Sequence, residues 1–582
     1  MTQQSQNGGA APTPAQKAEA ARAAAVEAAR IAAEAAAAAE AAEREAQEAA
    51  ENEARNAAAQ GATAAPPLSG PAAEIASGYS SAGVALELGT VLVDGVVDPA
   101  ARVRIPLATI NRHGLVAGAT GTGKTKTLQG IVEQLSGAGV PVVMADVKGD
   151  LSGLSKPGEA NEKITARAAE TGDGDWTPAG SPVEFLSLGT EGVGIPVRAT
   201  ITAFGPILLS KVLGLNATQE STLGLIFHWA DTRGLALLDL KDLRSVIAHL
   251  TSDDGKADLA GIGGVSPATA GVILRALANL EAEGGDTFFG EPEFATEDLL
   301  RFDSDGRGVI TLFELGAQAA RPALFSTFLM WVLADLFQTL PEEGDLDKPK
   351  LVFIFDEAHL LFTDASKAFL QQVEQTVKLI RSKGVGVFFC TQLPTDVPNA
   401  VLSQLGARIQ HALRAFTPDD QKALNKTVRT YPKTQFYDLE KALTSLGIGE
   451  AIVTVLSEKG APTPVAWTRM RPPRSLMDTI GNDAIRGAAA SSPLAQRYGR
   501  TVDRESAYEK LSAKVAGAPA TDEDIDLPSL PDLPAPAEPD GPNMAEQILG
   551  NPAVKSFLRS AASAAGREIS RSIFGTGRRR RR

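Results

Sequence analysis

Several stretches of the chain carry residues whose types and spacing suit chemistry on a phosphate group. The first is residues 118–125, GATGTGKT, which satisfies the pattern G-x-x-x-x-G-K-[ST]. Glycines in such a loop let successive backbone N–H groups turn towards one anion. The lysine supplies a positive charge for the β- and γ-phosphates, and the threonine supplies a hydroxyl for Mg²⁺. The residues expected to bind a nucleoside triphosphate are Gly118, Ala119, Thr120, Gly121, Thr122, Gly123, Lys124, Thr125 and Lys126.

Acidic residues and an amide follow two apolar runs further along the chain. Asp356 and Glu357 come directly after LVFIF, and Gln392 comes after VFFCT. Asp356 suits the carboxylate that holds Mg²⁺ opposite Thr125. Glu357 is placed to polarise a water that attacks the γ-phosphate, so it indicates hydrolysis rather than binding alone. Gln392 would orient the same water or sense the γ-phosphate.

An arginine at the end of a predicted helix could complete this chemistry. Arg381 stands in the sequence RSKG, and there it could face the nucleotide of a neighbouring subunit, where its fixed charge would stabilise the transition state. Arg408 and Arg414 compete for this role, and a surface arginine favoured by the helix dipole is the plain alternative. The predicted catalytic residues are Glu357, Gln392, Arg381 and Lys124, and the predicted metal ligands are Thr125 and Asp356.

The elements that must position these residues are strands and helices of one sheet. Residues 114–117 are a short apolar strand that enters the loop, residues 127–135 continue as a helix, and residues 140–145 form the next strand. The right-handed crossover of such a βαβ unit makes its two strands parallel. Apolar runs before Asp356 and Gln392 add two more strands, and ligands bind beyond the carboxyl ends of such strands. The sequence therefore predicts that three separate stretches converge on one site.

The fold class follows from the same apolar runs. Continuous apolar strands need cover on both faces, so we expect an α/β fold with a mostly parallel sheet between helices. Between about 205 and 285 the apolar residues have helical spacing, as in Leu208, Leu209, Val212 and Leu213. This spacing predicts a helical insertion.

Composition narrows the class of protein further. The chain has 582 residues and a net charge of -14. A negative net charge argues against a surface covered with positive charge that binds nucleic acid. It does not exclude a ring around DNA, which needs positive charge only along its pore. The single cysteine, Cys390, excludes an intramolecular disulfide, and its apolar neighbours predict a buried side chain. The N-terminal sequence lacks the pattern of a signal peptide, and no apolar run is suited to crossing a membrane. We therefore expect a cytoplasmic protein with no integral membrane segment.

Five motifs together resemble one known family. GATGTGKT, ADVKGDLSG, LVFIFDEAHLLF, RSKGVGVFFCTQLPTDVP and ARIQHALRAF are similar to motifs of the HerA-like ATPases in the HerA–FtsK superfamily, in particular its bacterial YjgR-like branch. The resemblance spans about residues 111–467. It implies a RecA-like P-loop NTPase core with an extra strand between the two Walker strands, the use of ATP and Mg²⁺, a homo-oligomeric ring, usually hexameric, and ATP-driven movement of double-stranded DNA.

The resemblance also implies roles for single residues, and one departure leaves the substrate open. By position, Lys124 and Thr125 bind phosphate and metal, Asp356 and Glu357 serve Mg²⁺ and hydrolysis, Gln392 is the polar sensor and Arg381 is the finger that acts in trans. HerA proper begins with a small β-barrel that helps rings to form, whereas an alanine-rich tail and at most a few strands precede the loop here. A P-loop ATPase that acts on a protein or a protein complex, docked through its tails, is therefore the alternative to a DNA translocase or helicase.

Changes in composition predict the domain organisation. Residues 1–74 are an alanine-rich tail, helical or disordered, with a linker, and residues 75–475 are the P-loop ATPase domain. A helical extension follows at 476–515, and residues 516–543 form an acidic, proline-rich linker. Residues 544–582 are an amphipathic basic helix with an arginine tail, which could bind an anionic membrane, DNA phosphates, the ATPase core or a neighbouring subunit.

Overall fold

The computed structural model describes residues 69–146, 149–190, 192–259, 263–315, 322–344, 346–363 and 365–516. The chain divides into two units, residues 1–517 and 518–582, and every described residue belongs to the first. Residues 1–68 of the expected alanine-rich tail, residues 517–543 of the expected acidic linker and the basic helix expected at 544–582 lie outside the described residues.

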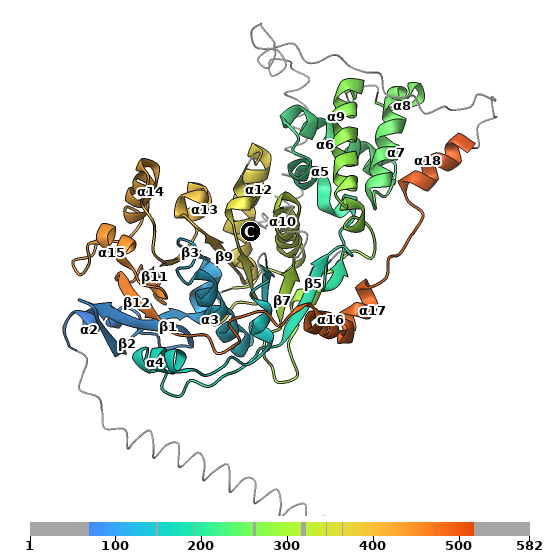
Figure 1. Ribbon diagram of the computed structural model, residues 1–582. Helices are drawn as coiled ribbons and strands as arrows, with labels where there is room; N and C mark the ends of the chain where they lie inside the picture. The colour runs from blue at the N-terminus through green and yellow to red at the C-terminus, as the bar shows by residue number, and fades with distance from the viewer. Residues whose placement is uncertain are drawn as a thin grey trace, which may run out of the picture. The chain divides into compact units, whose positions relative to one another are not determined.

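One sheet holds the strands of the described chain together (Figure 1). These strands are β1 (Ala85–Val93), β2 (Val96–Pro106), β3 (Gly114–Ala117), β4 (Val142–Asp146), β5 (Val183–Leu188), β6 (Ile195–Val197), β7 (Ile310–Glu314), β8 (Leu351–Phe355), β9 (Val385–Thr391), β10 (Ala407–Gln410), β11 (Glu450–Thr454) and β12 (Ala466–Met470). Their order in the sheet is β2-β1-β12-β11-β10-β3-β9-β8-β4-β7-β5-β6. The strands from β10 to β6 in this order are parallel, and the rest are antiparallel.

The order of the parallel strands confirms the expected RecA-like core. β9 pairs with β3, which leads into the loop at 118–125, and also with β8, which ends before Asp356. An extra strand therefore separates the two Walker strands, as the family resemblance implies. The loop, Asp356 and Gln392 consequently lie at the carboxyl ends of three adjacent strands.

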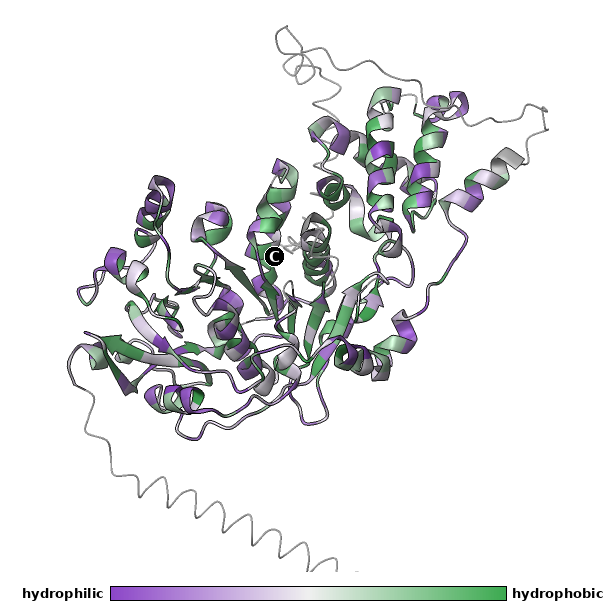
Figure 2. Ribbon diagram, viewed as in Figure 1, coloured by the Kyte–Doolittle hydropathy of each residue, from purple (hydrophilic) through white to green (hydrophobic). Residues whose placement is uncertain are grey.

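Side chains of the parallel strands alternate between two apolar clusters, because successive residues of a strand point to opposite faces. In β3, Leu115 and Ala117 join one cluster and Val116 joins the other. The first cluster includes α10 (Pro322–Thr339) and α12 (Lys367–Ile380), and the second includes α3 (Lys124–Gly137). Figure 2 shows the central strands in the green of apolar residues. The expected sheet with helices on both faces is therefore confirmed.

A group of helices is inserted between β6 and β7, as the apolar spacing predicts. It consists of α5 (Ile201–Val212), α6 (Ala217–Thr232), α7 (Leu240–Thr251), α8 (Asp253–Asp258) and α9 (Pro267–Ala282). Asn216 and Asp239 begin α6 and α7 with capping boxes, in which the cap side chain accepts from the backbone of the first turn. The group joins the core through α5, which contacts α10 (Figure 1).

Shorter elements complete the described chain. They are α2 (Gly70–Ser77), η1 (Leu107–Arg112), η2 (Ser152–Ser155), α4 (Glu162–Glu170), η3 (Gly285–Thr287), η4 (Thr296–Leu299), α11 (His359–Phe362), η6 (Arg381–Lys383), η7 (Pro394–Asp396), α13 (Asn399–Leu402), α14 (Pro418–Val428), α15 (Leu439–Ser445), α16 (Asn482–Ser491), α17 (Pro493–Tyr498) and α18 (Ala507–Ala516). Within the described residues, no helix is long and apolar enough to cross a membrane.

The antiparallel edge of the sheet is the part that the sequence predicts least well. The sequence predicts no strand at β10 or β12, where polar residues interrupt the apolar ones. β1 pairs with β2 on one side and β12 on the other. The strands that precede the loop in the described chain therefore extend the central sheet rather than form a separate barrel.

Candidate functional site

Glycines with unusual backbone angles shape the loop between β3 and α3. Gly118, Gly121 and Gly123 have φ values of 151°, 79° and 111°, which residues with a Cβ rarely adopt. A Cβ on Gly118 would also lie 2.5 Å from the Cβ of His411. Within the described structure, no acceptor is bound by the backbone N–H groups of Gly121, Thr122 and Gly123. The loop therefore presents a set of unsatisfied donors, the arrangement that fits a phosphate.

Lys124 directs its ammonium group into the same loop. Its Nζ donates to the carbonyl oxygens of Gly118 at 2.6 Å and Ala119 at 3.2 Å, and the residue is 8% exposed. Thr125, the next residue of α3, is half-buried. The first N–H groups of a helix have no intrahelical acceptor, so this end of α3 adds donors and the positive end of the helix dipole to the loop. Backbone donors, lysine and hydroxyl thus occupy the positions that phosphate and Mg²⁺ binding requires.

His411 contacts the loop and α3. It lies in the motif ARIQHALRAF, but the sequence predicts no role for it. Its Nε2 lies 3.0 Å from Thr127 Oγ1 in α3, and its backbone N–H donates to Ala117 at 2.7 Å. Burial, assisted by the charge of Lys124, lowers the pKa of His411 to about 4. The imidazole is therefore neutral at physiological pH and adds no charge beneath the phosphate loop.

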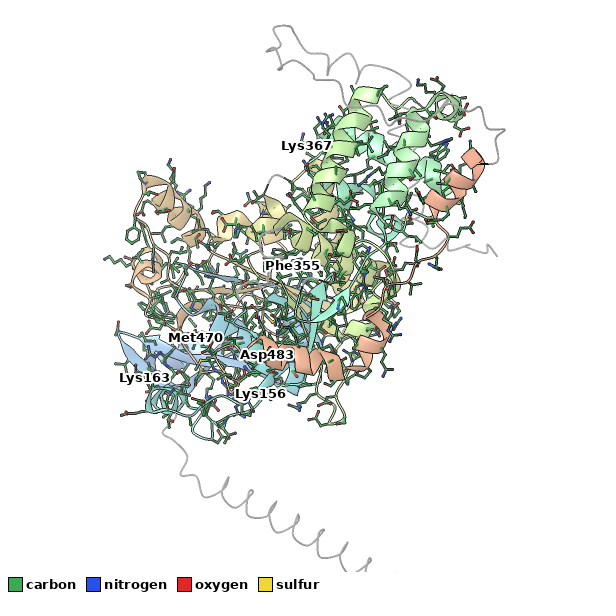
Figure 3. All side chains as sticks on the ribbon, turned by 45° about the vertical axis from the view of Figure 1, so that its right-hand side comes forward. Lys156, Lys163, Phe355, Lys367, Met470 and Asp483 are labelled. Atoms are coloured by element: carbon green, nitrogen blue, oxygen red, sulfur yellow. The ribbon has the colours of Figure 1, made fainter. Side chains whose placement is uncertain are left out.

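The acidic pair follows the buried strand β8. Phe355, the last residue of β8, lies in the interior of the molecule (Figure 3). Asp356 Oδ1 accepts the backbone N–H of Glu357 at 2.9 Å, and Glu357 has a φ of 47°. Positive φ is uncommon for a residue with a side chain, and such residues cluster at functional sites. Glu357 Oε2 lies 3.5 Å from His359 Nδ1, so the carboxylate is held at the strand end.

Cys390 in β9 connects the two Walker strands. It pairs with Val116 of β3, and its carbonyl accepts the N–H of Ala358 at 2.8 Å. Burial raises the pKa of the Cys390 thiol, and a hydrogen bond to Asp356 adds to this effect, whereas Lys124 opposes it. The expected buried cysteine is therefore confirmed. Because strands are spaced by about 4.8 Å, β3 and β8 lie about 10 Å apart, a separation that a bound phosphate and metal can span.

Gln392 is the first residue after β9 and is exposed at the same edge. The turn that follows it is held by Asp396, whose Oδ2 accepts from Thr391 Oγ1 at 2.7 Å and from the N–H of Leu393 at 2.9 Å. Gln392 therefore stands on a fixed turn between the loop and Asp356.

A further carboxyl pair at this edge was not predicted from the sequence. Asp146 and Glu314 are the last residues of β4 and β7 and pair in register. Asp146 Oδ2 accepts the N–H of Leu151 at 2.7 Å. Burial, together with the charge of Asp146, raises the pKa of Glu314 to about 8. Glu314 is therefore protonated at neutral pH.

The segment after β12, residues 471–480, runs along α3. Lys126 Nζ donates to the carbonyl of Met477 at 2.8 Å, Gln129 Nε2 donates to Leu476 at 2.7 Å, and Glu133 accepts from the backbone of Arg474. Burial lowers the pKa of Lys126. The Lys126 side chain is thus bound to this segment. The group of Lys126 that can contact a phosphate is therefore its backbone N–H.

The three candidates for the arginine finger, Arg381, Arg408 and Arg414, lie at two opposite edges of the sheet. Arg414 Nη2 lies 3.4 Å from the carbonyl of Thr120, so it belongs to the loop of its own chain. Arg381 and Arg408 instead line one pocket at the amino-terminal ends of β3, β9 and β10. That pocket is at the opposite edge of the sheet from the loop, so Arg381 cannot reach the loop of its own chain.

A comparison with models of protein families shows to which family the chain belongs. The family described as "Helicase HerA-like C-terminal" matches residues 93–582. The chain belongs to this family. The HerA-like resemblance of the five motifs is therefore confirmed.

The solved structures to which this chain is similar are distant in sequence. The unbound bacterial conjugative coupling protein TrwB is 16% identical, with a TM-score of 0.46, over 72% of this chain and 98% of that one. TrwB in complex with ADP and Mg²⁺ is 17% identical, with a TM-score of 0.45, over 71% and 96%. VirB4 of Thermoanaerobacter pseudethanolicus is 16% identical, with a TM-score of 0.44, over 67% and 97%. A search of curated protein sequences finds no match.

The HerA-like core thus brings most of the predicted site residues to one edge of the sheet. The residues at the carboxyl ends of the strands are the loop residues Gly118, Ala119, Thr120, Gly121, Thr122, Gly123, Lys124, Thr125 and Lys126, with Asp356, Glu357 and Gln392. Arg381 lies apart from them at the amino-terminal edge.

Proposed function

We propose that the protein is an Mg²⁺-dependent ATPase that works as a ring and moves double-stranded DNA. The observation that carries the proposal is the loop with unsatisfied backbone donors and a buried lysine, set across one strand from Asp356 and Glu357. Membership of the HerA-like helicase family supports the same activity.

The residues at the carboxyl ends of the parallel strands, the carboxyl edge of the sheet, have different roles in the proposed hydrolysis. Lys124 would exchange its two carbonyl acceptors for β- and γ-phosphate oxygens, while the loop N–H groups hold the remaining charge. Thr125 and Asp356 are the residues that would hold Mg²⁺, which would neutralise phosphate charge when bound. Glu357 accepts a proton from the attacking water, and Gln392 orients that water.

Arg381 supports a ring rather than an isolated chain. It ends α12 and lies at the edge opposite to its own loop. An arginine finger must touch the transferred phosphate to stabilise its charge. If Arg381 is the finger, it acts on the nucleotide of a neighbouring copy, and the hydrolytic site forms between two copies.

The alternative substrate is a protein or a protein complex. The net charge of -14 favours it, because a polyanion is not attracted to a chain of the same sign. Family membership favours DNA more strongly, since the family description names a helicase.

The rate of ATP hydrolysis with and without double-stranded DNA tests the proposal. We expect hydrolysis that requires Mg²⁺ and increases at least severalfold with DNA at low salt, with the stimulation decreasing as salt rises. Lys124→Ala serves as the inactive control for contaminating ATPases. Hydrolysis without any stimulation by DNA at low salt would reject the translocase and leave the ATPase on a protein substrate. No hydrolysis under either condition would reject both.

A further inference from the structure

The direction of the triphosphate across the loop determines where the rest of a nucleotide lies. β8, which ends before Asp356, lies beyond β9 on one side of β3, whereas β10, β11 and β12 lie on the other side (Figure 1). In the proposed hydrolysis the γ-phosphate must face Asp356 and Glu357, because these residues serve the metal and the attacking water. The opposite end of the triphosphate, which carries the ribose and the base, therefore points towards β10, β11 and β12.

The turn before β11, residues 447–449, reaches the loop on this side. β11 runs antiparallel to β10, so it begins at the carboxyl edge, where β10 ends. The backbone N–H of Gly449 donates to the carbonyl of Thr122 at 3.0 Å, and a Cβ on Gly123 would lie 3.3 Å from the Cα of Gly449. The turn therefore contacts the half of the loop that leads into α3.

Hydrogen bonds from charged side chains fix the backbone of this turn. Glu450 Oε2 accepts the N–H of Gly447 at 2.9 Å. From α4, Arg167 donates to the carbonyl of Gly449 at 3.2 Å, and its Nη2 lies 3.4 Å from the carbonyl of Ile448. These contacts hold the turn beside the phosphate loop without using the side chain of Ile448.

The side chain of Ile448 is exposed although its backbone is fixed. The residue is 76% exposed, and among the large apolar residues that the structure describes only Phe416, at 84%, exceeds it. A single exposed apolar side chain is ordinary on a protein surface. This one, however, stands on a fixed turn at the end of the loop where the base of a nucleotide is expected. A base placed against it would remove apolar surface of both from water.

We propose that Ile448 contacts the nucleobase and that the turn 447–449 is the base-binding wall of the nucleotide site. The inference rests on the proposed ATPase. Apolar contact with the face of a base does not depend on the groups at its edge, because every base has such a face. This contact therefore gives no preference between adenine and guanine, and the site takes ATP and GTP alike.

A comparison of nucleotides with inorganic tripolyphosphate separates the base from the phosphates. In the full-length Glu357→Gln chain with Mg²⁺, calorimetric titration should show that Ile448→Asn weakens binding of ATP and of GTP about tenfold. Binding of tripolyphosphate should not change. Ile448→Phe should bind both nucleotides at least as tightly as the Glu357→Gln chain, since an aromatic ring stacks on a base.

The variants also need a control for loss of an exposed apolar side chain. Val96→Asn is the matched control, because Val96 is β-branched, 70% exposed and at the start of the edge strand β2. It should leave the binding of all three ligands unchanged. Ile448 is exposed, so its variants should fold, and thermal unfolding checks them.

Three results would overturn the proposal. One is unchanged binding of ATP by Ile448→Asn. Another is an equal loss of ATP and tripolyphosphate binding, which would show that the turn supports the loop rather than the base. The third is a loss in Phe416→Asn but not in Ile448→Asn, which would place the base against the segment after β10. Failure of the proposed ATPase gives a different result, because the Glu357→Gln chain would then bind neither nucleotide nor tripolyphosphate.

Discussion

The two edges of the parallel sheet differ in the chemistry that they present. The carboxyl edge combines the donors of the loop and Lys124 with the carboxylates of Asp356 and Glu357, so it suits an anion and a metal together. The amino edge presents cations without carboxylates, so it suits an anion alone. Strand polarity separates the two sets within one chain, which means that they can meet only when a second copy is present.

The largest effect is expected at the carboxyl edge. Glu357→Gln should reduce ATP turnover by up to about 10⁴-fold, because the base is lost while the loop remains intact. Lys124→Ala should lose both turnover and ATP binding. Hydrolysis assays with parallel nucleotide-binding measurements check this difference, and Glu283→Gln on the exposed end of α9 is the control. Unchanged turnover in Glu357→Gln would remove Glu357 as the base.

A smaller loss of turnover should distinguish Arg381 from Arg414. Arg381→Ala should lower ATP turnover about 10³-fold without loss of ATP binding, and mixing with Glu357→Gln chains should restore part of it. Arg414→Ala should weaken ATP binding about tenfold, since its guanidinium contacts the loop of its own chain. Mixing should not rescue Arg414→Ala. Recovery of both variants, or of neither, would contradict the assignment of the two arginines to different edges.

Stability of the loop depends on the glycine nearest to His411. Gly118→Ala should reduce the free energy of unfolding by roughly 2–3 kcal/mol, because the added Cβ meets His411 and the backbone angle is unfavourable. Gly130→Ala in α3 is the opposite case: its Cβ meets no atom within 4 Å, and alanine favours a helix by up to about 1 kcal/mol. Urea denaturation should therefore show changes of opposite sign. Equal changes would show that loop geometry does not matter for stability.

Ionisation of Glu314, at the carboxyl edge, should lower the free energy of unfolding as pH rises towards 8. Its pKa is raised from 4.5 to about 8 in the folded chain, so its contribution is fully present below pH 4.5 and is lost as pH rises through 8. Between pH 6 and pH 9 the wild type should lose about 3 kcal/mol more than Glu314→Gln. Urea denaturation at both pH values measures this, and equal losses would show that Glu314 ionises normally.

At the amino-terminal edge of the sheet, His113 should lower the free energy of unfolding as pH falls rather than as it rises. Burial lowers the pKa of His113 from 6.5 to about 4, so its contribution is present above pH 6.5 and is lost as pH falls through 4. From pH 7 to pH 5 the wild type should lose about 2 kcal/mol from this residue. His113→Asn, which tolerates the φ of 62°, should lose less over the same interval. An identical loss would assign the acid sensitivity elsewhere, for example to His411.

The sequence predicts those elements of the fold whose residue patterns lie within one short stretch of the chain. The run of apolar residues before Asp356 predicts a buried strand, and the glycines of the loop predict the turn into α3. The antiparallel edge was harder, because polar residues interrupt the apolar ones in β10 (ARIQ) and β12 (AWTRM). Neither strand is a continuous apolar run, and pairing with neighbouring strands defines both. The second carboxyl pair was missed for the same reason, since Asp146 and Glu314 meet only through β4 and β7.

The chemistry of the loop and of Asp356 and Glu357 follows from the sequence alone, because each depends on a few consecutive residues. The edge to which each arginine belongs follows from the fold instead. Arg381, Arg408 and Arg414 look alike in sequence, and their distance from the loop depends on strand order and polarity, which are set by packing across the whole sheet. The same packing places His411 beneath the loop and gathers cations at the opposite edge.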